Sequence, residues 1–201
     1  MTNDALTTTT ALLHTLRTSD DGEVWDQFVA RYTPILRAIA RRLGLSEEDA
    51  SDVAQQTLLQ FVGGMRTGKY DRSRGRLRSW IVSIAEHRSR DMQRHLRSRP
   101  SEGPPLEEAS DRLARLESWW EEEERAHIAA AAWEELRTGE RTDEKGVQVF
   151  ELVALRDVPP LEAGRQLGMT VGAVYAAKYR IASRLKMVIE RLTSVYDASM
   201  P

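Results

Sequence analysis

The chain has 201 residues, of which 41% are hydrophobic and 30% charged, and its formal net charge is −2. This composition is typical of a soluble folded protein, and the length suits one large domain or two small ones. Because the sequence contains no cysteine, disulfides and thiolate zinc sites are excluded.

The N-terminal part of the chain predicts a polar tail followed by helices. Residues 1–9 lack a basic n-region, and no window of the chain reaches the ~18 apolar residues of a membrane helix. We therefore expect neither a signal peptide nor an anchor, and a cytoplasmic protein. Residues 11–16 are a short helix candidate. Apolar residues from Trp25 to Leu43 recur at helical steps, with Pro34 either kinking this helix or starting a new one, and Gly44 ending it.

A second helix is predicted over residues 46–62, with Ser46 as its N-cap and Asp49 as the return partner of a capping box. We expect Gly63 and Gly64 to end it. Its outer face is acidic and polar, and no Lys or Arg occurs from residue 44 to residue 65. Such a face is either simply solvated or a docking surface for a basic partner.

The next segment is strongly basic and combines a loop over 65–76 with a helix over 77–97. Residues 66–99 contain 11 Lys and Arg against 3 Asp and Glu, a net charge of +8. A concentrated basic segment in a nearly neutral chain indicates binding to phosphate backbones, and the alternative is a solvated basic face. We expect Trp80, within the apolar stripe of this helix, to lie in the core.

The composition changes abruptly at residues 100–105, where three prolines and a glycine indicate a domain boundary. Residues 100–125 contain 9 acidic and 3 basic residues, a net charge of −6. The run Glu121–Glu124 follows Trp119 and Trp120. We favour a solvated linker helix with one anchored edge, and the alternative is an acidic segment that folds back and masks the basic helix.

The rest of the chain also predicts helices, at 128–136 and at 147–155, where a helix is favoured over a strand. The predicted fold class is therefore all-α. We expect an N-terminal helical domain over 1–99, an acidic linker over 100–125 and a C-terminal domain over 126–201.

The last helices form a helix-turn-helix pattern. A short helix ends at Gly168, and Thr170 caps a longer helix over 170–192 with a net charge of +4. The N-terminal residues of such a second helix meet base edges in the major groove. These positions are Gly172, Ala173, Tyr175, Ala176 and Tyr179, while Lys178, Arg180 and Arg184 are placed for phosphates. The alternative is an ordinary helical hairpin.

Together, DASDVAQQTLLQF (49–61), YDRSRGRLRSWIVSIAEHRSRD (70–91) and the C-terminal helix-turn-helix resemble bacterial RNA polymerase sigma factors of the two-domain, extracytoplasmic-function group. The resemblance covers the chain from about residue 12 to residue 192, except for 100–125. It implies that the acidic helix docks on core RNA polymerase. The matching positions are Asp49, Asp52, Gln55 and Gln56.

The resemblance also implies two DNA-binding sites. The loop over 65–76 would capture a base flipped from the downstream promoter element, which the following helix reads. The residues of that site are Tyr70, Arg72, Arg74, Arg76, Arg78, His87, Arg90 and Arg94. Tyr70 could stack on a base or serve packing, and His87 could bond a base or backbone or be a plain surface residue.

The upstream element would be read by the helix-turn-helix, through the residues named above and Thr170. Tyr175, Ala176 and Ala177 stand where relatives often carry polar or Arg readers. Alanine offers only methyl contacts, so we expect weak or unusual base discrimination there.

The implied function is to direct core RNA polymerase to specific promoters and to assist DNA opening. The sequence contains no nucleotide loop, metal cluster or nucleophile–base arrangement, so we expect no enzymatic activity and no cofactor. The implied partners are core RNA polymerase and promoter DNA, both as duplex and as melted strand, with an anti-sigma factor as a further candidate. Two alternatives are a stand-alone helix-turn-helix regulator, which leaves the acidic and basic helices unexplained, and a protein-binding adaptor, which leaves the +8 segment unexplained.

Overall fold

The computed structural model describes residues 22–71, 76–96, 109–139 and 143–199. These residues form helices and short connections without a strand, which confirms the all-α prediction. The predictions for residues 1–16, for the loop residues 72–75 and for the break at 100–105 lie outside this part. The chain divides into a first unit, residues 1–127 with 195–201, and a second unit, residues 128–194.

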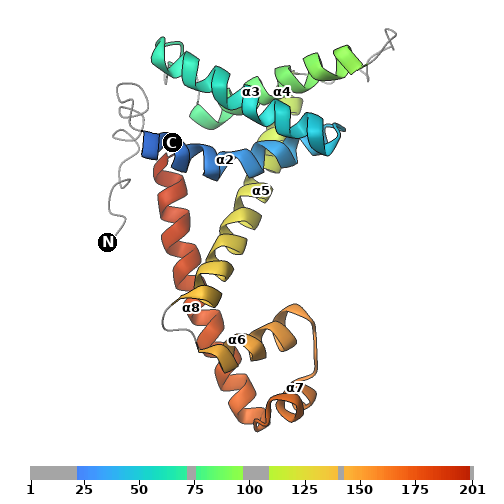
Figure 1. Cartoon of the computed structure of the whole chain (residues 1–201), viewed down its shortest axis with the longest axis vertical. Helices are drawn as coiled ribbons and strands as arrows, with labels where there is room; N and C mark the ends of the chain where they lie inside the picture. Colours follow the sequence, from blue (N-terminus) through green and yellow to red (C-terminus); the bar gives the residue numbers. More distant parts are fainter. Residues whose placement is uncertain (1–21, 72–75, 97–108, 140–142, 200–201) are drawn as a thin grey trace. The chain divides into compact units, whose positions relative to one another are not determined.

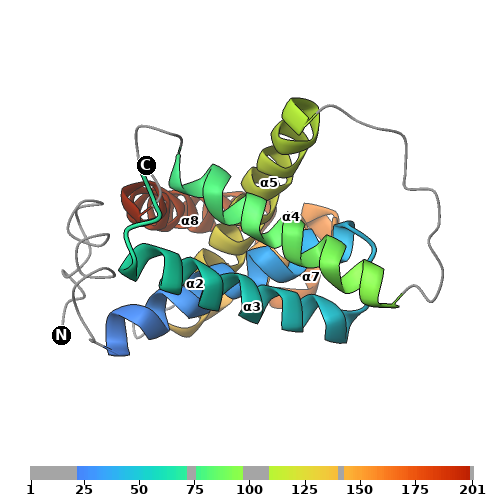
Figure 2. The ribbon, with the colours of Figure 1, turned by 90° about the horizontal axis from the view of Figure 1, so that it is seen from above.

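Three helices form the framework of the first unit: α2 (Gly22–Arg42), α3 (Glu47–Arg66) and α4 (Leu77–Leu96). Each of them packs against the other two (Figures 1 and 2). Their shared core contains an aromatic chain in which Phe28 stacks on Phe61 with ring centroids 5.1 Å apart, and Phe61 contacts Trp80 at 5.2 Å. Aromatic burial of this kind supplies large apolar area and fixes how the helices approach one another.

Helix α2 runs through Pro34 without a break, so the proline does not start a new helix. Thr33 Oγ1 donates a hydrogen bond to the Val29 carbonyl at 2.7 Å. The helix ends before Gly44, whose φ of 92° lies in the left-handed region that favours glycine. The predicted end of this helix is therefore confirmed.

Helix α3 begins as predicted and ends later than predicted. Ser46 Oγ accepts a hydrogen bond from the Asp49 N–H at 3.1 Å, which confirms the N-cap. The prediction that Gly63 and Gly64 end the helix was wrong, because α3 continues through both to Arg66. A Cβ on Gly64 would lie 2.8 Å from the Trp80 ring, so this glycine permits the close approach of α4 rather than a helix end. The left-handed residue after the helix is Gly68.

Helix α5 (Ala109–Thr138) is much longer than the predicted helix over 128–136. Its sequence contains neither proline nor glycine, so nothing in it interrupts the helix. Within the first unit its early part is anchored by Leu116 and Trp120, both fully buried. The predicted division at 99 and 125 stays a prediction; by its contacts, the acidic segment from residue 109 onwards belongs to the first unit.

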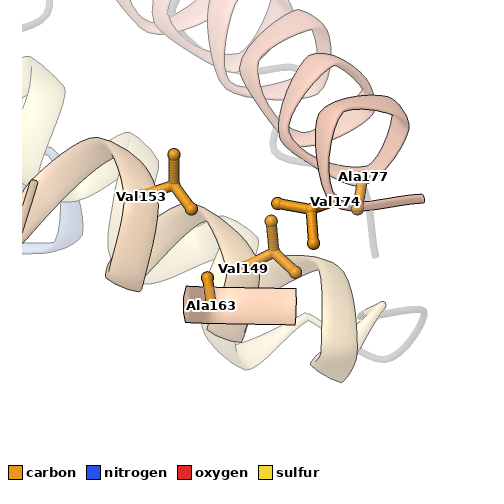
Figure 3. Close-up of a cluster of buried hydrophobic side chains, with 5 residues drawn as sticks. All are labelled: Val149, Val153, Ala163, Val174 and Ala177. Carbon is orange, nitrogen blue, oxygen red and sulfur yellow. The ribbon is translucent and has the colours of Figure 1, made fainter. Parts of the chain in front are cut away.

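The second unit contains the end of α5, α6 (Glu144–Phe150), a π-helical turn η2 (Glu151–Leu155), α7 (Pro160–Leu167) and α8 (Val171–Ser199) as far as Ser194. The segment over 147–155 is thus helical, as predicted. One core cluster joins α6, η2, α7 and α8 through small apolar side chains (Figure 3). Its buried members are Val149, Val153, Ala163, Val174 and Ala177.

The connection between α7 and α8 depends on two glycines and a cap. Gly168 has a φ of 64° and ends α7. Thr170 Oγ1 accepts a hydrogen bond from the Ala173 N–H at 3.2 Å and caps α8, as predicted. A Cβ on Gly164 would lie 2.7 Å from the Met169 carbonyl oxygen, so only glycine fits under this tight turn.

Adjacent glycines of α3 provide a matched test of this packing. Gly64→Ala should lower the free energy of unfolding by about 1–3 kcal/mol, because the new methyl group overlaps the Trp80 ring. Gly63→Ala has open space around its Cβ and should instead gain about 0.5–1 kcal/mol from helix propensity. Urea unfolding of both variants checks this, and equal effects would contradict the packing role of Gly64.

Candidate functional sites

The outer face of α3 presents three of the four predicted docking residues to solvent. Asp52, Gln55 and Gln56 are exposed, and their side chains form no hydrogen bond or ion pair with the part of the chain that the structure describes. Asp49 is only half exposed, and its carboxylate accepts a hydrogen bond from Ser46 Oγ. Asp49 therefore has a structural role in capping α3, besides any role in docking.

The same face contains Leu59, a residue that the sequence reasoning did not single out. It is 66% exposed, although Leu58 beside it is buried. On a helix, Leu59 lies one turn after Gln55 and Gln56, so it extends their stripe. The helical periodicity of the sequence could have predicted its exposure, because Leu59 falls outside the apolar stripe that faces the core. A single exposed leucine is common on protein surfaces, so Leu59 characterises this face only together with the polar residues beside it.

The basic residues of α4 differ in their exposure and in the ion pairs that they form within the protein. Arg78 is mostly buried and pairs with Glu121 of α5 at 3.0 Å. Arg90 pairs with Glu86 of its own helix at 2.7 Å, and the exposed Arg94 lies 3.5 Å from Asp91. Arg76 and His87 are exposed. The predicted contacts Arg72 and Arg74 lie outside the described residues.

The acidic run of α5 contacts two different helices. Glu121 pairs with Arg78 of α4, whereas Glu122 and Glu123 pair with Arg42 of α2 at 2.7 and 2.9 Å. Trp119 completes this contact, because the Arg42 guanidinium lies 5.7 Å from its ring centroid. The run therefore forms ion pairs with both α2 and α4, and masking of the basic helix stays a prediction.

A pocket of about 340 Å³ opens between the loop that follows α3, the start of α4 and the start of α5. Its lining residues are Lys69, Tyr70, Asp71, Arg76, Ser79, Trp80, Ser83 and Leu113. Tyr70 stacks on Trp80 with ring centroids 5.4 Å apart, so this tyrosine both packs and forms part of the wall. Trp80 is only partly buried, and it is a wall of the pocket as well as a core residue.

The exposed residues near the start of α8 are small or aromatic. Tyr175 and Tyr179 are 56% and 75% exposed, and they lie one turn apart. Thr170, Gly172 and Ala176 are also exposed, while Ala173 is half-buried.

Ala177 does not belong to this face, because it is fully buried in the core cluster with Val174. Its identity therefore reflects packing and carries no information about bases. The expectation of weak base discrimination then depends on Tyr175 and Ala176 alone.

Arg180, predicted to meet phosphate, is tied to α6. Its guanidinium lies 3.1 Å from the carboxylate of Asp143, which also accepts a hydrogen bond from the Gly146 N–H and caps α6. The Gly146 N–H and the charge of Arg180 lower the pKa of Asp143, and Arg184 adds to this effect. Lys178 is half-buried. Lys178 and Arg180 flank the exposed Tyr179 in the sequence. A phosphate bound by Arg180 would therefore compete with Asp143 for the guanidinium group.

The described residues contain neither a candidate membrane helix nor a candidate metal site. None of their helices is long and apolar enough to span a bilayer. They also contain no group of three or more His, Cys, Asp and Glu side chains arranged to hold a metal ion.

Comparison with known proteins identifies similar sequences. Residues 28–99 match the family model of sigma-70 region 2. The chain is 28% identical over 201 residues to the ECF RNA polymerase sigma factor ShbA of Streptomyces griseus subsp. griseus, covering 95% of this chain and 100% of that protein. Among solved structures, CnrH in complex with the cytosolic domain of CnrY is 24% identical with a TM-score of 0.36, covering 94% of this chain and 99% of that chain.

Proposed function

We propose, from the premise that this chain belongs to the RNA polymerase sigma factors, that it directs core RNA polymerase to specific promoters and assists DNA opening. The observation that carries the proposal is the match of residues 28–99 to sigma-70 region 2, together with the homology over nearly the whole chain. The chain itself would catalyse nothing and need no cofactor, since the polymerase supplies the chemistry. It would act in the cytoplasm, where its polymerase partner is.

The distribution of charge within the first unit supports a division of labour between two surfaces. Residues 47–65 of α3 contain no Lys or Arg, and the face with Asp52, Gln55 and Gln56 carries the exposed Leu59. A face of this kind would be repelled by DNA and suits a basic protein surface. We therefore assign it to core polymerase, with Leu59 as an additional contact.

The neighbouring surface is suited to nucleic acid. It combines the basic residues of α4 with a pocket that has two aromatic rings in its wall. Extruding a base costs a few kcal/mol of unstacking, which phosphate attraction and stacking on aromatic side chains can offset. We assign this surface to melted promoter DNA and the face of α8 with Tyr175 and Tyr179 to duplex DNA. Binding of an anti-sigma factor stays a prediction.

The function is tested by transcription from a promoter library with purified core polymerase, with and without the chain. We expect a defined subset of promoters to be transcribed only when the chain is present. Transcription that does not depend on the chain would contradict the proposal. Tight, sequence-specific binding to duplex DNA by the chain alone would instead favour a stand-alone regulator.

The docking assignment predicts that Asp52→Lys weakens binding to core polymerase by about tenfold or more, because it places a cation against a basic partner surface. The fold should be unaffected, since Asp52 is exposed. Asp91→Lys is the matched control: it makes the same charge reversal on α4, where the lost contact is an exposed ion pair with Arg94. Equal affinity of the two variants in a pull-down titration would rule out this face as the docking surface.

A further inference from the structure

One carboxylate of the second unit, that of Asp143, has a different partner on each of its oxygens. Oδ1 accepts a hydrogen bond from the Gly146 N–H at 2.9 Å and caps α6, while Oδ2 lies 3.1 Å from Nη2 of Arg180 on α8. The Gly146 N–H and, after it, Arg180 lower the pKa of this carboxyl group, so it is charged at neutral pH. A fixed negative charge therefore lies against a cation of α8.

The packing between α6 and α8 determines the place of this carboxylate. A Cβ on Gly146 would lie 2.5 Å from Asp143 Oδ2 and 3.1 Å from the Ile181 side chain. Ile181 directly follows Arg180 and is buried in a core cluster that includes Phe150. Glycine at position 146 thus leaves room for the carboxylate beside α8. The contact is built by the fold and is more than a chance meeting of two flexible side chains.

The same ion pair is accessible to a competing anion. The side chains of Asp143 and Arg180 are 37% and 58% exposed, and Tyr179, next to Arg180 in the sequence, is 75% exposed. A guanidinium group binds carboxylate and phosphate through the same fork of N–H donors. Exposed ion pairs contribute little to stability. A phosphate can therefore replace the carboxylate, but it has to compete for the guanidinium group.

We propose that Asp143 is an internal competitor for duplex phosphates, which occupies Arg180 and lowers the affinity of the chain for duplex DNA of any sequence. Asp143 would act through Arg180 and is therefore a positioning residue. Phosphate contacts supply essentially all of non-specific DNA binding, so a cation that is already paired reduces it. The inference rests on the proposed function, because it takes duplex DNA as the ligand of α8. Its consequence is a chain that binds DNA less tightly when it is apart from core polymerase.

The test measures binding of the full chain, without polymerase, to a labelled duplex of random sequence by fluorescence anisotropy, from about 50 to about 200 mM salt. Asp143→Asn keeps an oxygen that caps α6, because asparagine is as good an N-cap as aspartate, but it removes the charge that holds Arg180. We expect it to tighten binding about threefold at low salt, the equivalent of one exposed ion pair. The slope of log K against log salt should steepen by about 0.9, as for one additional phosphate contact.

Glu135→Gln is the matched control within the same unit. It removes the same charge and releases Arg191 of α8, which lies 2.5 Å from Glu135 and about three turns further along the helix than Arg180. This variant should leave the slope unchanged. In an Arg180→Gln background, Asp143→Asn should have no further effect on the slope, because the side chain through which it acts is gone.

The possible results distinguish this inference from the proposed function. If Asp143→Asn leaves the slope unchanged or behaves as Glu135→Gln does, Asp143 is not a competitor. If Asp143→Asn weakens duplex binding, Asp143 orients Arg180 toward phosphate, which also overturns the inference. An effect that persists without Arg180 would show direct repulsion of phosphates and would equally overturn it. The proposed function fails separately, through transcription from the promoter library that does not depend on the chain, and that result leaves the competition at Arg180 in place.

Discussion

The arrangement of the first unit depends on one contact, the insertion of Trp120 from α5 against Tyr32 of α2, with ring centroids 5.6 Å apart. Burying an indole removes about 200 Å² from water, which stabilises by about 5 kcal/mol. Its N–H has no hydrogen-bond partner in the described part of the chain, at a cost of about 1–3 kcal/mol. Burial therefore outweighs the unpaired N–H, and the exposed ion pairs of Arg42 with Glu122 and Glu123 add little stability.

That contact determines what the neighbouring surfaces can do. Because α5 is held beside α4, Leu113 becomes a wall of the pocket, Glu117 binds Ser79 and Glu121 binds Arg78. Acidic side chains thus lie directly next to a surface that we assign to DNA. They would lower non-specific phosphate binding there. The exposed face of α3 that we assign to core polymerase does not take part in this arrangement.

Periodicity and capping residues predicted most of the fold, and helix-to-helix packing accounts for what they missed. Local backbone geometry determines the roles of Ser46, Gly44 and Thr170. These roles could therefore be predicted from the residues next to them in the sequence. Gly64 was misread as a helix end because its partner, Trp80, is remote in the sequence. The pocket wall from α5 was missed for the same reason. Ala177 was read as a groove position, and only its burial identifies it as core.

The central claim, that the acidic start of α5 is a fixed part of the first unit, is tested most directly by native-state hydrogen exchange of the full chain. If Trp120 anchors this segment, the amides around Leu116 and Trp120 should open with the same free energy as those around Val53 in the core of α3. Exchange faster by about a hundredfold at Leu116 and Trp120 than at Val53 would show that the segment opens independently, as a tether would. That result would contradict both the anchor and the completed pocket.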